Sequence, residues 1–341
     1  MRAAVYHSNS DVRIEERPVP EIGAGEILVR IAASGICGSD VMEWYRIKKA
    51  PLILGHEIAG TVERIGDGVT RWKPGDRVTV AHHVPCNSCR RCLMGHHSLC
   101  KTLRTTKLDP GGFCELVRVP ALQTEVGTFA LPEGMSFLQG SFSEPLGCVV
   151  RGQRRAGMAP GRHVAVLGSG LSGLLQIKLA RALGAGRIIA SDALEHRLEA
   201  AERFGADAAV KPEALTSERI RALTGGPLAD LVIVCTGAQA AFCTAHALAE
   251  PGGTVLLFAI PEPGADTALP LFEIWNKGLQ IATTYASPPR DTMEALELIR
   301  SGRVNVDELV SHCLPLSEAQ EGFRITASGE GLKVVLEPQS G

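Results

Sequence analysis

The sequence has no excess of charge of either sign. It contains 35 lysines and arginines and 37 aspartates and glutamates, and neither kind is clustered into a basic stripe or an acidic block. A protein that binds nucleic acid needs a basic surface, and an acidic solvating tail needs a run of like charges. The charge pattern argues against both classes, and a small molecule is the expected partner.

Long apolar runs are also missing. No uninterrupted stretch approaches the ~18 apolar residues that a membrane-spanning helix needs. The best candidate, 164–190, is interrupted by glycines and by Lys178, Arg181 and Arg187. The first residues, MRAAVYHSNSD, contain no apolar signal core, and no internal repeat or low-complexity segment is present. We therefore expect a soluble, cytoplasmic protein.

The chain is long enough for about two domains. Up to about residue 150, short β-type runs alternate with turn signals, which predicts a compact, mostly β domain. These runs are 26–32, 58–65 and 76–81, with a turn at 73–76. From residue 161 the pattern changes to strands that alternate with helices, which predicts a parallel, doubly wound sheet.

The second region begins with an apolar strand at 163–167, a glycine-rich turn and an apolar-periodic helix from Leu171. Its other expected elements are strands at 188–190, 231–235, 254–259 and 280–285 and helices at 195–204 and 240–249. A helix at 292–300 and an apolar tail at 333–336 follow, and this segment is too short to fold alone. We expect it to rejoin the first domain, so that 1–150 with 287–341 form one domain and 151–286 the other.

The turn after the strand at 163–167 carries the pattern G-x-G-x-x-G. Its residues are Gly168, Ser169, Gly170, Leu171, Ser172 and Gly173. Glycines here permit a tight turn and a close approach of the backbone to a pyrophosphate at the helix N-terminus. The pattern alone is weak, because a purely structural turn has the same letters. Its position between a strand and a helix favours dinucleotide binding.

Asp192 ends the next strand, about 20 residues further on. A carboxylate at that place binds both ribose hydroxyls and repels a 2′-phosphate, so NAD is favoured over NADP. The alternative is that Asp192 only caps a helix. Arg197 lies nearby in the sequence and would tolerate some NADP, which makes the expected preference less than absolute.

Four of the ten cysteines crowd into fifteen residues. They are Cys86, Cys89, Cys92 and Cys100. Four thiolates close a tetrahedral shell around zinc and leave no position for substrate, so the predicted site is structural. An iron–sulfur cluster is the alternative, since the spacing resembles some ferredoxin runs. The nearby histidines are interpreted as loop residues: His82, His83, His96 and His97.

The remaining chemistry lies in three segments, 34–40 (SGICGSD), 55–60 (GHEIAG) and 143–146 (SEPL). Taken singly, Cys37 is compatible with a buried thiol and His56 with a core histidine. Together with the cysteine loop and the glycine pattern, in this order, the segments closely resemble the zinc-containing medium-chain dehydrogenase/reductase superfamily. The resemblance covers essentially the whole chain, including 73–78 (KPGDRV) and 111–113 (GGF).

This resemblance implies an α/β protein with two domains, a GroES-like, mostly β catalytic domain and a Rossmann domain that binds NAD, with the active site between them. It implies that Cys37, His56 and a carboxylate hold a catalytic zinc. The Glu-Pro-Leu at 144–146 is similar to the sorbitol (polyol) dehydrogenase branch. In that branch Glu57 can be the third ligand, and Glu144 then contacts zinc only through water.

Charge favours one carboxylate at a time, because a thiolate and one carboxylate already neutralise Zn²⁺. We expect Glu57 and Glu144 to exchange during turnover; zinc-loaded crystals with and without NAD would test this, and an unchanged ligand set in both states would contradict it. In the implied mechanism, zinc lowers the pKa of the alcohol and Ser39 accepts its proton. The alternative for Ser39 is a hydrogen-bonded turn residue.

The sequence departs from the family pattern at three positions. Met42 stands where many relatives have a histidine that completes the proton relay, so the exit must use water, Glu43 or another group. Glu43 replaces an aromatic residue and points to an amine-bearing substrate, unless it is simply an exposed glutamate. Thr284 replaces an arginine that reaches the substrate, which makes sorbitol itself a less suitable substrate.

The resulting hypothesis is a zinc- and NAD-dependent dehydrogenase that oxidises a secondary hydroxyl of a polyol, cyclitol, aminocyclitol or sugar-like substrate. One alternative is a 3-hydroxy amino acid dehydrogenase of the L-threonine 3-dehydrogenase type. A second is a non-catalytic NAD-binding protein. The resemblance also implies a homodimer or homotetramer, for which the apolar run 280–285 is the expected edge strand.

Overall fold

A computed structural model describes residues 1–264 and 266–340. The chain divides into two compact units, one formed by residues 1–147 and 286–341 and the other by residues 148–285. Each unit has strands of its own and buried apolar clusters of its own. Within the described residues, no helix combines the length and the apolar character needed to cross a bilayer.

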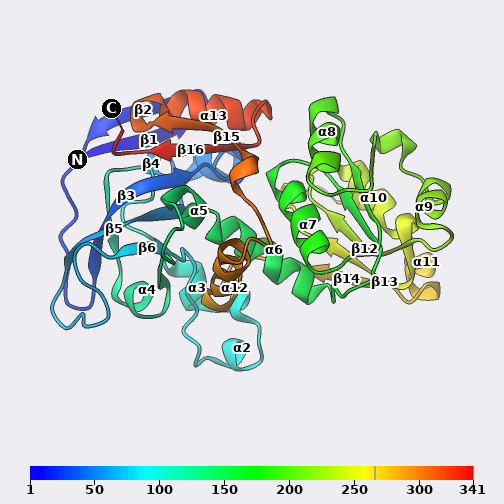
Figure 1. Ribbon diagram of the computed structural model, residues 1–341, viewed down its shortest axis with the longest axis horizontal. Helices are drawn as coiled ribbons and strands as arrows, with labels where there is room; N and C mark the ends of the chain where they lie inside the picture. The colour runs from blue at the N-terminus through cyan, green and yellow to red at the C-terminus, as the bar shows by residue number, and fades with distance from the viewer. Residues whose placement is uncertain (265, 341) are drawn as a thin grey trace. The chain divides into compact units, whose positions relative to one another are not determined.

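The first unit is mostly β (Figure 1). A seven-stranded sheet has the order β15-β16-β3-β5-β6-β8 with β7 paired to β3, and a three-stranded sheet has the order β2-β1-β4. The strands are β1 (Arg2–Ser8), β2 (Asp11–Glu16), β3 (Ile27–Gly35), β4 (Leu52–Ile53), β5 (Glu57–Ile65), β6 (Arg77–Val80), β7 (Leu116–Val119), β8 (Thr128–Ala130), β15 (Val310–Pro315) and β16 (Lys333–Glu337). The helices are α1 (Glu43–Arg46), α2 (Arg90–Leu93), α3 (Lys101–Thr105), α4 (Ala121–Val126), α5 (Phe137–Ser141), α12 (Pro289–Arg300) and α13 (Ala319–Ser328).

The C-terminal segment is an integral part of this unit. Strand β16, red in Figure 1, lies beside the blue β3, with Val335 opposite Gly35 and Leu336 opposite Ser34. Val334 and Leu336 of β16 belong to an apolar cluster that also contains Tyr6, Ile36 and Phe323. The first and last parts of the chain therefore share one core.

The second unit is a six-stranded parallel sheet with the order β11-β10-β9-β12-β13-β14. This is the 3-2-1-4-5-6 order of a doubly wound nucleotide-binding sheet. Its strands are β9 (Val164–Leu167), β10 (Ile188–Ser191), β11 (Ala208–Val210), β12 (Ala229–Val234), β13 (Ala249–Leu257) and β14 (Gln280–Thr283). Its helices are α7 (Leu171–Ala182), α8 (Glu195–Arg203), α9 (Ser217–Thr224), α10 (Gln239–Leu248) and α11 (Leu271–Asn276), while α6 (Ser143–Arg155) crosses the boundary between the units.

The predicted fold class, a mostly β domain combined with a doubly wound parallel sheet, is confirmed. Two of the differences from the sequence-based expectation have a clear physical reason. Strand β11 has only three residues, which is too short for a recognisable hydrophobic period. Helix α12 begins at Pro289 rather than at 292, because proline at the first helical position has a preset φ and needs no N–H partner.

Candidate active site

The ends of two neighbouring strands bring Cys37, His56 and Glu57 together. Strands β3 and β5 pair antiparallel with Gly35 opposite Glu57, so the end of β3 meets the start of β5. Cys37 follows β3 after one residue, and His56 directly precedes β5. One ligand atom from each of the three side chains lies within 4.8 Å of the other two. A sulfur, an imidazole nitrogen and a carboxylate oxygen at this separation are a donor set that suits zinc.

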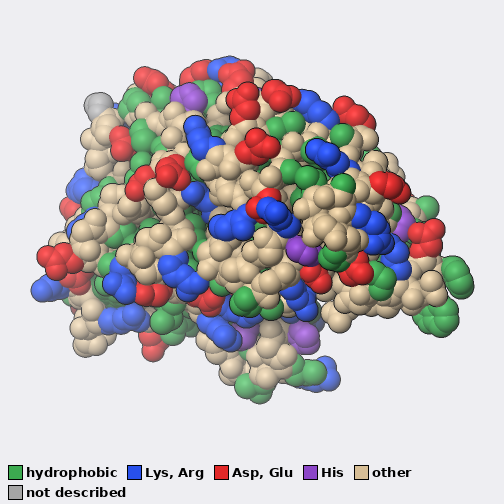
Figure 2. All heavy atoms as spheres, turned by 45° about the vertical axis from the view of Figure 1, so that its right-hand side comes forward, with side chains coloured by type: hydrophobic (Ala, Val, Ile, Leu, Met, Phe, Trp, Pro, Cys, Tyr) green, Lys and Arg blue, Asp and Glu red, His purple; other side chains and the backbone are tan. Residues whose placement is uncertain are grey.

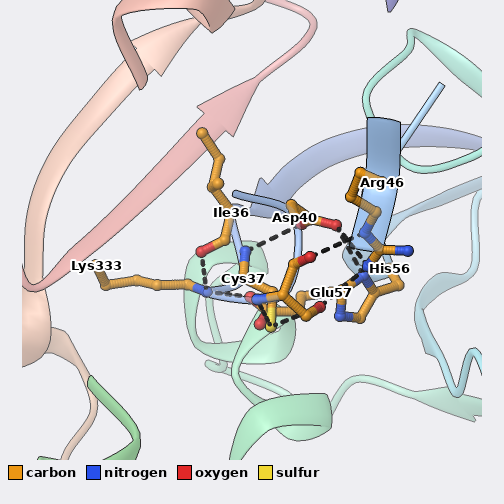
Figure 3. A network of polar contacts seen from close by, with 8 residues as sticks. Ile36, Cys37, Asp40, Arg46, His56, Glu57 and Lys333 are labelled. Carbon is orange, nitrogen blue, oxygen red and sulfur yellow. Dashed lines mark hydrogen bonds and ion pairs between the residues drawn. The ribbon is translucent and has the colours of Figure 1, made fainter. Parts of the chain in front are cut away.

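Glu57 has one oxygen paired and one oxygen free of hydrogen bonds. Its side chain is fully buried, and Oε2 pairs with Lys333 Nζ, which also donates to the carbonyl of Ile36 at 3.0 Å (Figure 3). Oε1 is buried without a hydrogen-bond partner among the described residues. A buried carboxylate oxygen is costly when left unpaired. An ion held beside Cys37 and His56 would satisfy it, so the residues present fit a zinc ion.

Asp40 stands behind His56. Its Oδ1 lies 3.5 Å from His56 Nδ1 and 3.3 Å from Arg46 Nη2, and its Oδ2 accepts the backbone N–H of Cys37 at 3.1 Å (Figure 3). Burial opposes the ionisation of Asp40, but His56, Arg46 and this N–H outweigh it and hold the pKa of Asp40 below its usual value. Asp40 thus occupies Nδ1 of His56 and leaves Nε2 for a metal.

The electrostatic potential around His56 favours a cation. Burial lowers the pKa of His56, but Asp40 and Cys37 more than compensate and raise this pKa well above its usual value. The same two anionic groups that stabilise a protonated imidazole also stabilise a metal ion in its place. Both the charge of the neighbouring groups and the spacing of the ligand atoms therefore suit a cation.

Ser39 lies against the sulfur of Cys37. Its hydroxyl donates to Cys37 Sγ at 3.4 Å and accepts a hydrogen bond from Arg46 Nη2 at 3.1 Å. Arg46 also donates through Nε to the Ser39 carbonyl at 2.8 Å. Arg46 therefore connects the hydroxyl of Ser39 with the carboxylate of Asp40.

Two other glutamates have different surroundings. Glu144, near the start of α6, is buried but does not belong to the group of Cys37, His56 and Glu57 whose ligand atoms lie within 4.8 Å. Glu43 is exposed, and its Oε1 accepts the backbone N–H of Asn9 at 3.0 Å. This hydrogen bond ties Glu43 to the turn between β1 and β2 and favours the interpretation as an exposed glutamate over an amine-binding role.

The four clustered cysteines form a second ligand group. The sulfur of Cys92 lies 4.0 Å from that of Cys86 and 3.6 Å from that of Cys89, and the sulfurs of Cys100 and Cys86 are 3.6 Å apart. A Zn–S bond of about 2.3 Å gives tetrahedral edges of about 3.8 Å, which matches these separations. An iron–sulfur cluster would hold the thiols further apart, because its own iron and sulfide atoms lie between them.

The environment of these thiols also suits a metal. Hydrogen bonds from the backbone N–H groups of Ser88 and Cys89 lower the pKa of Cys86 to about 5, whereas burial raises the pKa of Cys92 to about 12. A bound cation would deprotonate all four. Among the described residues, none of the four nearby histidines joins either ligand group.

The glycine-rich turn lies between β9 and α7. Gly168 has φ +95°, which disfavours other residues, and a Cβ on Gly173 would collide with the carbonyl of Gly168. Asp192, just after β10, accepts the backbone N–H groups of Ser169 at 2.8 Å and Leu194 at 3.0 Å. Arg197 Nη1 lies 3.7 Å from Asp192 Oδ2. The carboxylate is thus fixed beside the turn, where a dinucleotide would place its ribose.

Sequence reasoning missed three residues of the active site. Asp40 follows Ser39 directly in the chain, and this position next to a candidate catalytic residue was the signal that could have identified it. Arg46 carried no signal beyond its short distance from Ser39 in the chain. Lys333 carried none, because 276 residues separate it from Glu57.

Comparisons with known proteins agree with this geometry. Residues 23–132 match the family described as alcohol dehydrogenase GroES-like domain, and residues 173–301 match zinc-binding dehydrogenase. The chain is 33% identical to sorbitol dehydrogenase of Gallus gallus over 98% of its length and 95% of that protein. It is also 33% identical to probable D-xylulose reductase A of Aspergillus clavatus, over 95% of its length and 93% of that protein.

A solved structure, a putative zinc-binding dehydrogenase from Sinorhizobium meliloti 1021 bound to NADP, is 30% identical with a TM-score of 0.88 and covers 99% of both chains. The resemblance inferred from the motifs is confirmed. The chain belongs to the family of zinc-binding, GroES-like alcohol dehydrogenases, in its sorbitol dehydrogenase-like branch.

Proposed function

We propose that this chain is a zinc- and NAD-dependent dehydrogenase that oxidises a secondary hydroxyl of a polyol, cyclitol, aminocyclitol or sugar-like substrate to a ketone. The observation that carries the proposal is the group of Cys37, His56 and Glu57, with a buried Glu57 oxygen that lacks a hydrogen-bond partner among the described residues. The names of the relatives, sorbitol dehydrogenase and probable D-xylulose reductase, support the substrate class.

Cys37, His56 and Glu57 would hold the catalytic zinc, which when bound supplies the Lewis acidity that lowers the pKa of an alcohol. Ser39 lies against the Cys37 sulfur, and its hydroxyl is placed to accept the proton of the substrate. Arg46 contacts that hydroxyl but stays protonated, and Met42 has no acid–base group. Neither residue can carry the proton further, and the proposed exit from Ser39 is water.

The second unit would hold NAD, which when bound accepts the hydride. The proposed contacts are Gly168, Gly170, Leu171, Ser172, Gly173, Asp192 and Arg197. Residues 1–150 with 287–341 would be the catalytic domain, and Cys86, Cys89, Cys92 and Cys100 would hold a structural zinc. The exchange of Glu57 and Glu144 stays a prediction. A reducing compartment such as the cytoplasm suits a chain whose ten cysteines are all free.

The proposed function is tested by NAD reduction with a panel of polyols, cyclitols, aminocyclitols and 3-hydroxy amino acids, together with metal analysis. We expect turnover of at least one polyol-like substrate and about two zinc ions per chain. Activity with 3-hydroxy amino acids alone would favour the threonine-type alternative. One zinc or none, with no turnover on the panel, would indicate a non-catalytic NAD-binding protein.

Asp192 should decide the cofactor preference. Its negative charge beside the turn repels a 2′-phosphate, so we expect a higher kcat/KM with NAD than with NADP. Asp192→Asn keeps an oxygen that accepts the Ser169 N–H but removes the charge, and should reduce the NAD-to-NADP ratio of kcat/KM about tenfold. An unchanged ratio would show that another group selects the cofactor.

A second copy of the chain is the proposed partner. Strand β14 is the edge of the parallel sheet, and Ile281 on it is 44% exposed. On the preceding helix α11, Leu271, Phe272 and Trp275 are each more than 70% exposed. Hydrophobic side chains stand out at the right-hand edge of the surface in Figure 2, which otherwise mixes both charges. We expect light scattering to give a dimer or tetramer, and a monomer would contradict this.

A further inference from the structure

A lysine is buried beside the candidate metal centre. The side chain of Lys333, the first residue of β16, has no solvent exposure, and its ammonium group contacts the Ile36 carbonyl and the carboxylate of Glu57. A lysine is seldom fully buried unless its charge is paired. Figure 3 shows its side chain extended toward Glu57 from the side opposite His56.

The absence of a side chain at Gly35 leaves space for this ion pair. Strand β16 pairs with the last residues of β3, with Val335 opposite Gly35, and the end of the Lys333 side chain lies next to Gly35. A Cβ on Gly35 would lie 2.6 Å from Lys333 Cε and would also collide with Oε2 of Glu57. Glycine at position 35 therefore allows the ammonium and the carboxylate to meet in the core of the first unit.

The charges around the centre occur in pairs. Asp40 pairs with Arg46 at 3.3 Å, and Glu57 pairs with Lys333. The thiolate of Cys37 is the one anion of the ligand group without a lysine or arginine partner among the described residues. With Asp40 and Glu57 compensated, a divalent ion and the thiolate give this set of residues, which does not include Glu144, a net charge of about +1. Without Lys333 the net charge would be about zero.

We propose that Lys333 is a positioning residue that cancels the charge of Glu57 and so keeps a metal centre with a Cys-His-Glu ligand set net cationic. The inference rests on the proposed function, since it takes these three side chains as metal ligands. It revises the charge argument drawn from the sequence, in which one thiolate and one carboxylate neutralise zinc. A cationic centre attracts the developing negative charge on a substrate oxygen, which a neutral centre does less well.

The charge of the centre is measurable through its affinity for a small anion. The probe is azide, titrated at fixed pH into enzyme that carries cobalt(II) at the catalytic site, with binding followed by the visible spectrum of the cobalt. Lys333→Met lowers the net charge by one, Glu57→Gln raises it by one, and the double variant restores the original value. We expect azide affinity to be highest for Glu57→Gln, equal for wild type and the double variant, and lowest for Lys333→Met.

The expected step is about ten- to a hundredfold in affinity per unit charge, for charges about 6 Å apart at an effective dielectric constant of about 20 to 40. A purely structural role of the ion pair would make the double variant, which lacks the pair altogether, at least as impaired as Lys333→Met. Equal affinities in all variants, or a double variant as weak as Lys333→Met, would overturn the inference.

Folding of each variant is checked by circular dichroism and by retention of the zinc at the four-cysteine site. If Lys333→Met does not fold, the azide affinities of Glu57→Gln and of the double variant can be compared instead. These two variants also differ by one charge, so the comparison gives the same test. Failure of the proposed function looks different: cobalt would then not bind near Cys37, and no spectrum would respond to azide. Cobalt bound with the wrong order of affinities contradicts only the role of Lys333.

Discussion

Replacing Cys37 by alanine is expected to abolish dehydrogenase activity and to remove one of two zinc ions per chain. The side chain supplies the one ligand thiolate that no lysine or arginine compensates among the described residues, and it accepts hydrogen bonds from the N–H and the hydroxyl of Ser39. Loss of the Lewis acid removes several kcal/mol of stabilisation, so kcat/KM should fall at least about a thousandfold.

Cys313→Ala is the matched control for this variant. Cys313 is exposed and lies outside both ligand groups, so its replacement should leave metal content and turnover unchanged. A Cys37→Ala enzyme that keeps full turnover without metal near His56 would contradict both the ligand assignment and the proposed function. A normal metal content with lost turnover would instead place Cys37 in a role other than metal binding.

The order of elements was predictable where the chain repeats a short period or a local motif. The alternation of apolar strands and helices after residue 161 predicted the parallel sheet, and the spacing within 86–100 predicted four sulfurs around one point. Both signals are local, since the interacting residues are close in sequence. Short elements such as β11 carry too few residues to show a period and escaped prediction.

The surroundings of the active site were less predictable, because they depend on strand register. Cys37 and Glu57 meet since β3 and β5 pair with Gly35 opposite Glu57, and Lys333 arrives only through the pairing of β16 with β3. No local pattern at Lys333 distinguishes it from an ordinary surface lysine. The motifs therefore named the candidate ligand side chains, while the charges that surround them follow from long-range pairing.

This difference matters for the chemistry. The sequence placed a thiolate and two glutamates near one metal, which suggested a neutral or negative centre. The structure adds Arg46 beside Asp40 and Lys333 beside Glu57, so Asp40 and Glu57 each have a cation of their own, while Glu144 lies outside the ligand group. The Lewis acidity of the proposed centre would then depend on residues from α1 and β16 as well as on the ligands themselves.

Replacing Cys100 by alanine is expected to remove the other zinc ion and to unfold the loop 86–105 while the sheets of the first unit stay intact. The loop has little core of its own: Leu93 is 75% exposed, Met94 is 56% exposed, and Leu103 is its main buried apolar side chain. Metal binding of this kind supplies about 10 kcal/mol or more in small zinc domains, so losing it removes most of what orders the segment.

Limited trypsin digestion measures this local unfolding, because Arg90 and Arg91 lie inside the loop. We expect the Cys100→Ala variant to be cleaved there at least about tenfold faster than the wild type, with little change in the far-ultraviolet circular dichroism. Cys37→Ala supplies the comparison, since it should lose the catalytic zinc yet keep the loop resistant to trypsin. If Cys100→Ala retained two zinc ions and resisted cleavage, the four-cysteine group would not be a metal site, and the loop would owe its order to packing alone.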